Sequence, residues 1–299
     1  ILLEDIAIEG QQKLLASRVL IVGLGGLGTP AALYLAGAGV GTLVLADDDE
    51  VHLSNLQRQI LFTTEDINQP KAHVTRQRLN QLNPDIELVA LQTRLSGEDL
   101  QREVALADVV LDCTDNMATR QAINAACVAQ NTPLITASAV GFGGQIMVLT
   151  PPWAQGCYRC LWPDEAEPER NCRTAGILGP VVGVMGTLQA LEAIKLLSGM
   201  ETERNTLRLF DARSSGWRHL ALNRATARYA EAAMRILFND EPMTCDDDLT
   251  VAALLDMLRQ LKPGTALALN QQILPRERWE HQQVNEGDQI LLFQVIAGG

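Results

Sequence analysis

The chain has 299 residues, 47% of them hydrophobic, and a formal net charge of −12 at pH 7. This length and apolar content can fill one large and one small domain, the excess of acid argues against a nucleic-acid surface, and no uninterrupted run of about 18 apolar residues predicts a membrane span. The six cysteines are too scattered for a secreted disulfide framework, so we expect a cytoplasmic protein without nucleic-acid or membrane partners.

A βαβ unit opens the predicted fold. Residues 18–22 form a short β-branched run, residues 30–38 a helix rich in small residues, and residues 42–46 a second buried strand. Between the first strand and the helix lies a Gly-x-Gly-x-x-Gly loop, whose glycines are Gly23, Gly25, Gly26 and Gly28. In this context the loop predicts that backbone amides and a helix N-terminus hold the phosphates of a nucleotide.

Helices and strands continue to alternate as far as residue 137. The expected elements are a helix at 70–82, a strand at 86–90, a helix at 97–106, a strand at 108–112, a helix at 117–129 and a strand at 133–137. This order predicts an α/β domain with a Rossmann-like, doubly wound and mostly parallel sheet. Four acids at 47–50 follow the second strand, about 20 residues after the glycine loop, where one carboxylate can hold ribose hydroxyls.

The pattern changes after a strand that begins near residue 144. Prolines recur between residues 151 and 168 without a regular period, which indicates a functional loop rather than an ordinary connection. The remaining elements are expected at 180–198, a long apolar helix, and at 206–211 and 217–222, two strands. We expect the sheet to end at residue 222, so that the chain divides into a domain at 1–222 and a linker at 223–233.

Residues 234–299 predict a second, smaller domain. Its expected elements are a strand at 235–238, a helix at 250–261, a strand at 266–269 and a final strand that begins near residue 289. A helix that crosses a small mixed sheet in this order is the plan of a ubiquitin-like β-grasp domain. The sequence then reaches Gly298 and Gly299, which have no side chain, so the Gly299 carboxylate can enter a narrow channel and meet a reacting phosphate.

Polar side chains beyond the ribose position decide which nucleotide fits. Asn55 and Arg58 follow the acid cluster, and Lys71 opens the next helix. Each cation alone is typical of a solvated surface, but an arginine and a lysine that converge on a helix N-terminus favour a triphosphate over a dinucleotide. Asp115 follows the fourth strand, at the sheet edge where ligands bind, and is a candidate ligand for the Mg²⁺ of a triphosphate. A nicotinamide-dependent oxidoreductase, which shares the glycine loop, stays the alternative at this point.

Six segments carry a specific family resemblance. They are GLGGLG (23–28), ADDDEVHLSNLQRQ (46–59), QPK (69–71), DCTDN (112–116), CYRC (157–160) and NCRTAG (171–176). Through them, residues 18–222 closely resemble the ThiF family, the bacterial adenylyltransferases of thiamine thiazole synthesis, which are related to MoeB and to the ubiquitin-activating enzymes. Residues 234–299 resemble ThiS, the sulfur carrier that partners this family.

The resemblance implies a reaction and a set of residue roles. The Gly299 carboxylate would attack the α-phosphate of ATP, pyrophosphate would leave, and the resulting acyl-adenylate would react with sulfur. The implied roles are ribose binding for Asp47, phosphate binding and transition-state stabilisation for Asn55, Arg58 and Lys71, and Mg²⁺ binding for Asp115. Cys172 matches the family's reactive cysteine, which takes part in sulfur transfer through an acyl disulfide, and the flanking Arg170 and Arg173 would favour its thiolate.

Two features depart from the family pattern. Cys157 and Cys160 match half of a structural zinc site, but the second Cys-x-x-Cys, expected shortly after residue 222, is replaced by residues without cysteine. Two ligands do not close a tetrahedron, so we expect Zn²⁺ to be absent or weakly bound. The family also carries an arginine ahead of the position where this sequence begins, and relatives extend it across a dimer to the partner's ATP. Its loss would slow catalysis without abolishing nucleotide binding.

The resemblance also implies partners. The carrier would be this chain's own C-terminal domain, adenylylated in cis or across a homodimer, and the other partners would be a sulfur donor, such as a cysteine desulfurase or a rhodanese-like protein, and a thiazole synthase. A MoeB-like molybdopterin-carrier adenylyltransferase is the nearest alternative activity. A carrier fused to a degenerate, non-catalytic enzyme domain is the alternative from another class. Cys113 and Cys127 lie within or beside a predicted strand and helix, and we expect inert thiols there.

Overall fold

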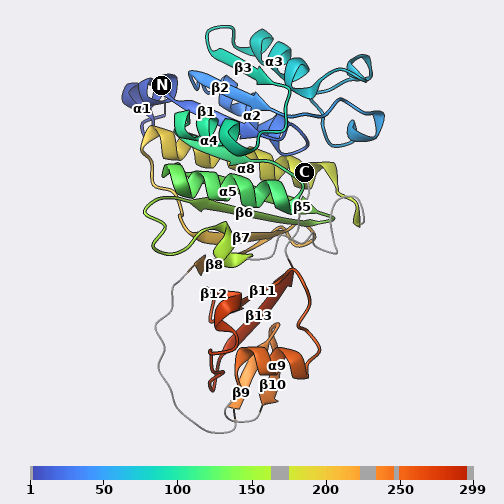
Figure 1. Cartoon of the computed structure of the whole chain (residues 1–299), viewed down its shortest axis with the longest axis vertical. Helices are drawn as coiled ribbons and strands as arrows, with labels where there is room; N and C mark the ends of the chain where they lie inside the picture. The colour runs from blue at the N-terminus through green and yellow to red at the C-terminus, as the bar shows by residue number, and fades with distance from the viewer. Residues whose placement is uncertain (1–2, 163–174, 223–233, 246–248, 295–299) are drawn as a thin grey trace.

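The computed structural model describes residues 3–162, 175–222, 234–245 and 249–294. In this part of the chain all named strands belong to one 13-stranded sheet. The strands of its amino-terminal portion are β1 (Arg18–Val22), β2 (Thr42–Ala46), β3 (Glu87–Leu91), β4 (Val109–Asp112), β5 (Leu134–Val140), β6 (Gly143–Leu149), β7 (Thr206–Asp211) and β8 (Gly216–Leu222). Figure 1 shows these strands stacked above the smaller carboxyl-terminal portion.

The order of these strands reverses between β1 and β4. The sheet runs β3-β2-β1-β4-β5 with every neighbouring pair parallel, and β6, β7 and β8 then add antiparallel strands. Apolar runs such as Val19–Val22, buried along their whole length, are typical of parallel strands covered on both faces. The reversal creates a crevice at the carboxyl ends of β1 and β4, where ligands bind in doubly wound sheets.

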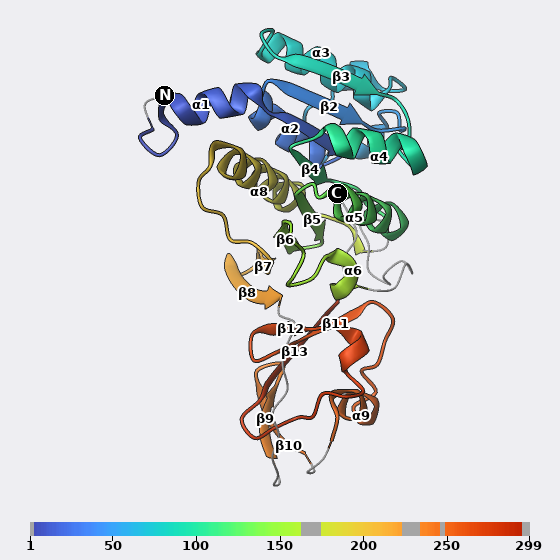
Figure 2. The same cartoon turned by 60° about the vertical axis from the view of Figure 1, so that its left-hand side comes forward.

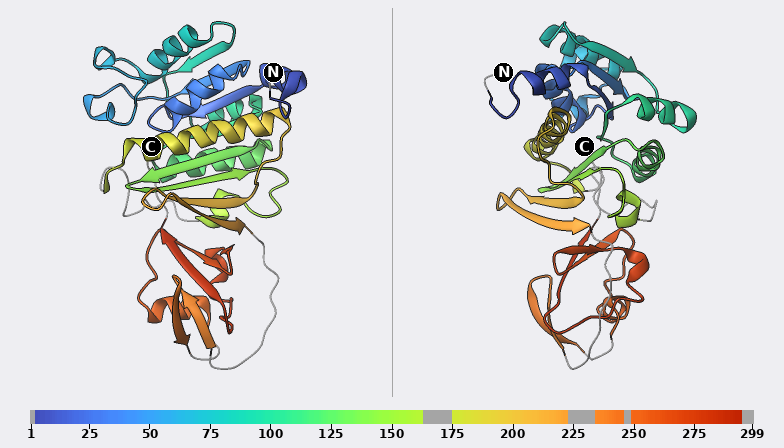
Figure 3. Two further views of the ribbon diagram at one scale, coloured as in Figure 1. Left: turned by 180° about the vertical axis from the view of Figure 1, so that it is seen from behind. Right: turned by 90° about the vertical axis from the view of Figure 1, so that its left-hand side faces the viewer.

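Helices cover both faces of the sheet, as Figures 2 and 3 show. They are α1 (Ala7–Ala16), α2 (Gly28–Gly37), α3 (Lys71–Leu82), α4 (Gly97–Leu106), α5 (Met117–Gln130), α6 (Tyr158–Leu161) and α8 (Gly179–Ser198). Residues of β1 alternate between the two resulting cores: Ile21 packs in the cluster shared with α2 and α8, and Leu20 in the cluster shared with α4 and α5. The predicted Rossmann-like, doubly wound fold is confirmed.

One helix, α8, is long and apolar enough to cross a membrane when judged by length and mean hydropathy alone. The sequence analysis did not predict a membrane span here because Gln189, Glu192 and Lys195 interrupt the apolar run. Half of the helix's most apolar stretch is buried, and the helix packs against α1, α2, β5 and β6. Its apolar surface therefore serves the core between helix and sheet.

The carboxyl-terminal portion is a small mixed sheet with one helix. Its elements are β9 (Met234–Phe238), β10 (Glu241–Cys245), α9 (Val251–Met257), β11 (Thr265–Leu269), β12 (Gln272–Leu274) and β13 (Gln289–Gln294). Thr250 caps α9 by accepting a hydrogen bond from the Ala253 amide at 3.2 Å. A separate core, which includes Ile236, Leu254 and Trp279, fills the space between α9 and the sheet. This arrangement agrees with the predicted β-grasp domain.

The expectation that the first sheet ends at residue 222 is wrong. Strand β12 of the carboxyl-terminal portion pairs in parallel with β8, so the sheet continues from one portion into the other. No local pattern predicts this pairing, because β12 spans only Gln272–Leu274 and meets its partner strand through tertiary packing. The predicted linker, 223–233, lies outside the described residues.

Candidate functional site

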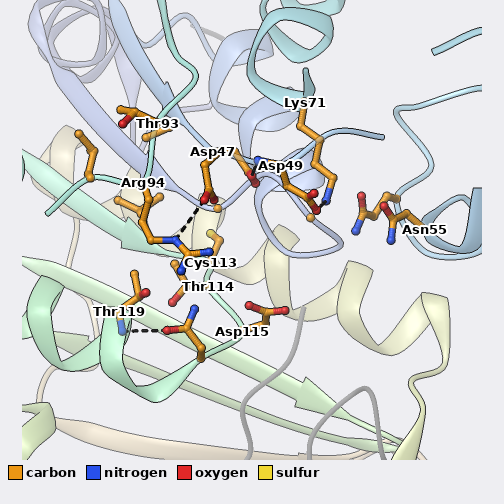
Figure 4. Close-up of a pocket in the computed structure, with 18 of the residues that line it drawn as sticks. Asp47, Asp49, Asn55, Lys71, Thr93, Arg94, Cys113, Thr114, Asp115 and Thr119 are labelled. Atoms are coloured by element: carbon orange, nitrogen blue, oxygen red, sulfur yellow. Dashed lines mark hydrogen bonds and ion pairs between the residues drawn. The ribbon is translucent and has the colours of Figure 1, made fainter. Parts of the chain in front are cut away.

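A cleft of about 470 Å³ opens at the crevice between β1 and β4. Figure 4 shows its two walls, one built from the ends of β1 and β2 and the start of α3, the other from the loop between β4 and α5. The residues predicted from the sequence that line this cleft are Gly23, Gly25, Asp47, Asn55, Arg58, Lys71 and Asp115. Gly26 and Gly28 are not among its lining residues.

Glycine is required at two places in the loop that follows β1. Gly23 has a φ of +92°, and a Cβ there would lie 2.6 Å from the carbonyl oxygen of Cys113. At Gly28, the first residue of α2, a Cβ would collide with the carbonyl oxygen of Gly23. The glycines thus let the loop fold back against the end of β4, so that Gly23 and Gly25 line the cleft just ahead of the N-terminus of α2. A helix N-terminus in this position attracts phosphate.

Asp47 fixes the shape of the same loop. Its Oδ2 accepts a hydrogen bond from the Leu24 amide at 2.6 Å, and its Oδ1 accepts one from the Asp49 amide at 2.8 Å. Burial raises the pKa of Asp47, although the Lys71 charge and both amides work in the opposite direction. Asp47 thus lines the cleft, as predicted, and in this structure it holds the glycine loop; its role in ribose binding stays a prediction.

Lys71 is a buried cation at the wall of the cleft. Only 6% of its side chain is exposed, and its Nζ lies 2.6 Å from Asp49 Oδ2. Burial tends to raise the pKa of Asp49, but the hydrogen bond and charge of Lys71 outweigh it and hold that pKa below its usual value. An ammonium group has three donors, so Lys71 can keep Asp49 and still donate to a phosphate.

The loop after β2 brings two further polar side chains to the cleft. A short 3₁₀ helix at Leu53–Asn55 turns the chain, and Asn55 Oδ1 accepts a hydrogen bond from the His52 amide at 3.1 Å. Arg58 is half-buried, and its Nη1 donates to the Ser54 carbonyl oxygen at 3.3 Å. The structure brings Asn55 and Arg58 to the same cleft as Lys71, as the sequence predicted.

The opposite wall carries Asp115. It is half-buried in the loop between β4 and α5, directly before Asn116, whose Oδ1 caps α5 by accepting a hydrogen bond from the Thr119 amide at 2.9 Å. A capped helix start holds this loop in place and aims it at the cleft. Asp115 thus faces Lys71 and Asp49 across the opening (Figure 4).

The loop that carries Asp115 is anchored by Arg120, a residue that the sequence analysis missed. Arg120 is 1% exposed, and its guanidinium donates to Asp112 Oδ2 at 3.2 Å, to the Ala137 carbonyl oxygen at 2.8 Å and to the Thr114 carbonyl oxygen. Burial opposes this charge, but Asp112 outweighs it and raises the pKa of Arg120. The available signal was an arginine spaced three residues from both Met117 and Ile123 in the helix after DCTDN.

Two more residues of the cleft also escaped the sequence analysis. Thr93 and Arg94 follow β3 and line the side near Asp48, whose Oδ2 lies 3.1 Å from Arg94 Nε. Nothing in the motifs marks them, since the segment after β3 has no characteristic pattern. Arg94 places a third cation, besides Arg58 and Lys71, at the rim of the cleft.

The cysteines divide into two kinds. Cys113 and Cys127 are buried, as expected, and burial raises the pKa of both thiols. Cys157 and Cys160 lie at the start of α6 with their sulfurs 3.8 Å apart. The hydrogen bond from Cys160 is the main cause that lowers the pKa of Cys157 to about 5, and Asn124 adds a second donor at 3.4 Å.

Among the described residues there is no group of three or more histidine, cysteine or acidic side chains placed to hold a metal ion. The expectation of absent or weak Zn²⁺ stays a prediction. Cys172 and Gly299 lie outside the part of the chain that the structure describes, so their predicted roles also stay predictions.

Two family models match the chain. The model of the ThiF family covers residues 1–230, and that of the ThiS family covers residues 236–299. The sulfur carrier protein ThiS adenylyltransferase of Escherichia coli strain K12 is 81% identical over 226 residues, which is 76% of this chain and 90% of that protein. The molybdopterin-synthase adenylyltransferase of the same strain is 44% identical over 225 residues, with 75% and 90% covered.

Solved structures agree with the fold. The crystal structure of E. coli MccB with AMPCPP and MccA has a TM-score of 0.64 and 25% identity, and the match covers 73% of this chain and 67% of that one. A second MccB structure, in which the enzyme is bound to MccA-N7isoASN, has a TM-score of 0.65 and 24% identity, with 73% and 68% covered. These likenesses support the Rossmann-like portion of the chain.

Proposed function

The chain belongs to the ThiF family and carries a ThiS-family segment, and from this premise we propose that it uses ATP to adenylylate the Gly299 carboxylate of that segment. The observation that carries the proposal is the union, in one chain, of a ThiS-family carrier with a cleft lined by Asp47, Lys71 and Asp115. The reaction is one step toward the carrier thiocarboxylate of thiamine thiazole synthesis.

The bonding changes follow from the substrates. An oxygen of the Gly299 carboxylate attacks the α-phosphorus of ATP in line, the bond to the bridging oxygen of the β-phosphate breaks, and pyrophosphate leaves with the electron pair. Negative charge spreads over the phosphate oxygens as this happens. Cations fixed in place before the reaction stabilise that charge at no cost of reorganisation. The product is a mixed anhydride, whose carbonyl carbon is open to a sulfur nucleophile.

Each wall of the cleft has a part in this step. Asp47 and the glycine loop position the nucleoside together, because the Asp47 carboxylate already accepts a hydrogen bond from the Leu24 amide of that loop at 2.6 Å. Lys71, whose Nζ lies 2.6 Å from Asp49 Oδ2, and Arg58 offset the charge of the phosphates. Asp115 on the other wall supplies the hard oxygen ligand that Mg²⁺ prefers, and the MgATP substrate brings the ion with it.

Sulfur transfer to the carrier follows adenylylation in this proposal. A sulfur donor that carries a persulfide would transfer its outer sulfur to the Cys172 thiol. The outer sulfur of the Cys172 persulfide would then attack the adenylate carbonyl, release AMP and form an acyl disulfide, and a thiazole synthase would act afterwards. A homodimer and a cytoplasmic location belong to the same proposal. None of these partners is needed for adenylylation itself.

The comparisons and the cleft disfavour the three alternative functions considered from the sequence. The identity of 81% to a ThiS adenylyltransferase against 44% to a molybdopterin-synthase adenylyltransferase favours the thiamine pathway. Membership of the ThiF family removes the reason to consider a nicotinamide oxidoreductase. A degenerate enzyme domain is disfavoured because the nucleotide-binding side chains still line one cleft.

The proposal is tested by exchange of radiolabelled pyrophosphate into ATP. The full-length protein with Mg²⁺ should catalyse exchange, and deletion of Gly298 and Gly299 should abolish it while ATP still binds. Exchange that persists in the shortened protein would show that the acceptor is some other group. No exchange in either protein would favour the degenerate fusion.

A further inference from the structure

The carrier segment sits on the enzyme portion of its own polypeptide through a continuous sheet. In the register of β8 and β12, Ala221 is the partner of Gln272 and Leu222 is the partner of Ile273. The Ala221 amide also donates to the Gln271 carbonyl oxygen at 3.1 Å. Edge strands that pair in this way fix both the position and the direction of the carrier.

The carrier sheet has two apolar faces, which pack against different parts of the protein. On β13, Ile290 and Leu292 pack in the carrier's own core, whereas Leu291 and Phe293 pack against the cluster of the enzyme portion. On β11, Leu267 belongs to the carrier core. Period-two alternation of this kind means that the second face was shaped to be covered.

Three carrier residues are fully part of the enzyme's core. Ala266, Ala268 and Ile273 are 2%, 1% and 3% exposed and share a cluster with Tyr158, Leu161, Trp162, Leu207, Leu220 and Leu222. The small alanine side chains let the two backbones approach closely. We call the contact between the carrier segment and the enzyme portion the seam. Its centre is therefore packed like a protein interior.

The rim of the seam is polar and open. Arg218 Nη2 lies 2.9 Å from Asp240 Oδ2, but both side chains are more than half exposed, so this ion pair adds little to affinity. A cavity of about 170 Å³, bordered by Cys160, Leu222 and Arg278, lies along the same seam. The apolar centre, and not the rim, holds the carrier in place.

The end of β13 lies beside the enzyme sheet. The Gln294 carbonyl oxygen accepts a hydrogen bond from Gln145 Nε2 at 3.1 Å, and Gln145 is 7% exposed. Gln145 is on β6, opposite Ser138 of β5. The last described residue of the carrier is thus attached to a strand only one position away from β5.

The strand register gives the separation between β6 and the edge of the cleft. Asp112 of β4 is the partner of Thr136, so Thr114, which lines the cleft, lies near the level of Ser138. Gln145 is opposite Ser138, and two strand spacings amount to roughly 10 Å. Residues 295–299 lie outside the described part, but by length alone five extended residues reach at most roughly 17 Å. The length of these five residues is thus of the same order as the separation between β6 and the cleft, which favours a route within one subunit.

We propose that this chain adenylylates its carrier in cis: the carrier is seated on the β8 edge of its own polypeptide, and Gln145 directs the final strand toward the adjacent cleft. This inference rests on the proposed function. It leaves no place for a neighbour's carrier on the same edge while the chain's own carrier occupies it. Gln145 acts here as a positioning residue.

Two complementary variants test the route. The first, Asp115→Asn, keeps the tail but has an impaired cleft, and the second lacks Gly298 and Gly299 but keeps the cleft. They are co-expressed with different affinity tags, hetero-oligomers are isolated, and AMP on the Asp115→Asn tail is measured by mass spectrometry with MgATP. Each variant alone gives the background, and the unmodified protein gives the full signal.

A cis route predicts that the mixture forms no more AMP adduct than the two backgrounds together. Adduct on the Asp115→Asn tail at a quarter or more of the unmodified protein's level would show transfer between subunits and overturn the cis route. Failure of the unmodified protein to form adduct would instead contradict the proposed function. The two failures are therefore distinguishable.

A second experiment tests whether the seam presents the tail, by placing a charged side chain in its buried centre. Ile273→Asp places a carboxylate in the buried centre and should slow tail adenylylation by about tenfold or more, because the seated state becomes unfavourable. Gln260→Asp, at an exposed position of the carrier outside the β8–β12 pairing, is the control and should keep the normal rate. ATP binding and melting temperature show that the enzyme portion remains folded. An unchanged rate for Ile273→Asp with a folded protein would show that the seam does not present the tail.

Discussion

At the scale of single residues, Lys71 connects the fold to the chemistry. The pattern Gln-Pro-Lys predicted a cation at a helix start, and the structure buries that cation against Asp49. Burial and the pairing with Asp49 hold the Lys71 side chain in one position, unlike the many exposed cations of the chain. A fixed charge is what electrostatic stabilisation of a phosphoryl transition state requires.

Lys71→Met should therefore reduce pyrophosphate exchange by about 100-fold or more, the scale of losing one preorganised donor. Lys13→Met is the control, because Lys13 is exposed on α1, where it pairs with Glu9. Steady-state exchange kinetics measure both variants. Exchange by Lys71→Met within a factor of three of the unmodified protein would remove Lys71 from the mechanism.

Cys157 offers a pH-dependent prediction. A pKa lowered to about 5 means that its thiolate, the reactive form, is present above pH 5 and is lost as the pH falls through that value. Iodoacetamide should thus label Cys157 at nearly constant rate from pH 8 to about pH 6 and more slowly below about pH 5.

Peptide mapping by mass spectrometry measures this labelling and separates Cys157 from Cys160. Cys113 and Cys127 are internal controls, since both are buried and burial raises their pKa. Labelling of Cys157 that rises steeply between pH 7 and pH 9 would show an ordinary thiol and contradict the geometry.

Residues also show where sequence reasoning stops. Asp47, Asn55, Arg58, Lys71 and Asp115 were found because they lie in recognisable segments next to predicted strand ends, and all five line the cleft. Arg120 was missed because its role arises from tertiary contacts. It reaches from α5 to the ends of two strands, and no local pattern encodes that reach.

At the scale of elements, the turn from β1 into α2 sets the position of the cleft. Gly28→Ala should weaken ATP binding by about tenfold and lower stability by about 1–3 kcal/mol, because the new Cβ collides with the Gly23 carbonyl oxygen. Gly37→Ala in the same helix meets no atom within 4 Å and should be neutral or slightly stabilising.

Nucleotide titration and thermal melting measure both substitutions. If the two alanine variants behave alike, the close approach of the loop to α2 has no energetic consequence. A loss confined to Gly28→Ala shows that the loop, and not helix propensity, is the sensitive feature.

The elements themselves were predictable where apolar runs are long and bounded by glycine or polar residues. The expected strands at 18–22, 42–46 and 206–211 and the helix at 97–106 match the structure at both ends. Helix α1 was missed, and so was β12, which has three residues. The helix expected at 250–261 ends at Met257. Short elements and helix ends depend on contacts with distant residues, which local patterns do not report.

At the scale of the whole molecule, two domains share one sheet. The sequence predicted both domains but separated them at residue 222, because a pairing between strands 50 residues apart leaves no local mark. The seam between β8 and β12 closes that gap and places Gln294 against the enzyme portion. The fusion thus tethers the carrier to the enzyme portion and also fixes its position there.

The central claim is that AMP becomes bonded to the end of the carrier segment. The most direct measurement is the intact mass of the full-length protein after incubation with MgATP, followed by mapping of the carboxyl-terminal peptide. We predict an AMP adduct confined to that peptide and absent from the protein without Gly298 and Gly299. An unmodified carboxyl terminus in protein that binds ATP under all divalent-ion conditions would contradict the account.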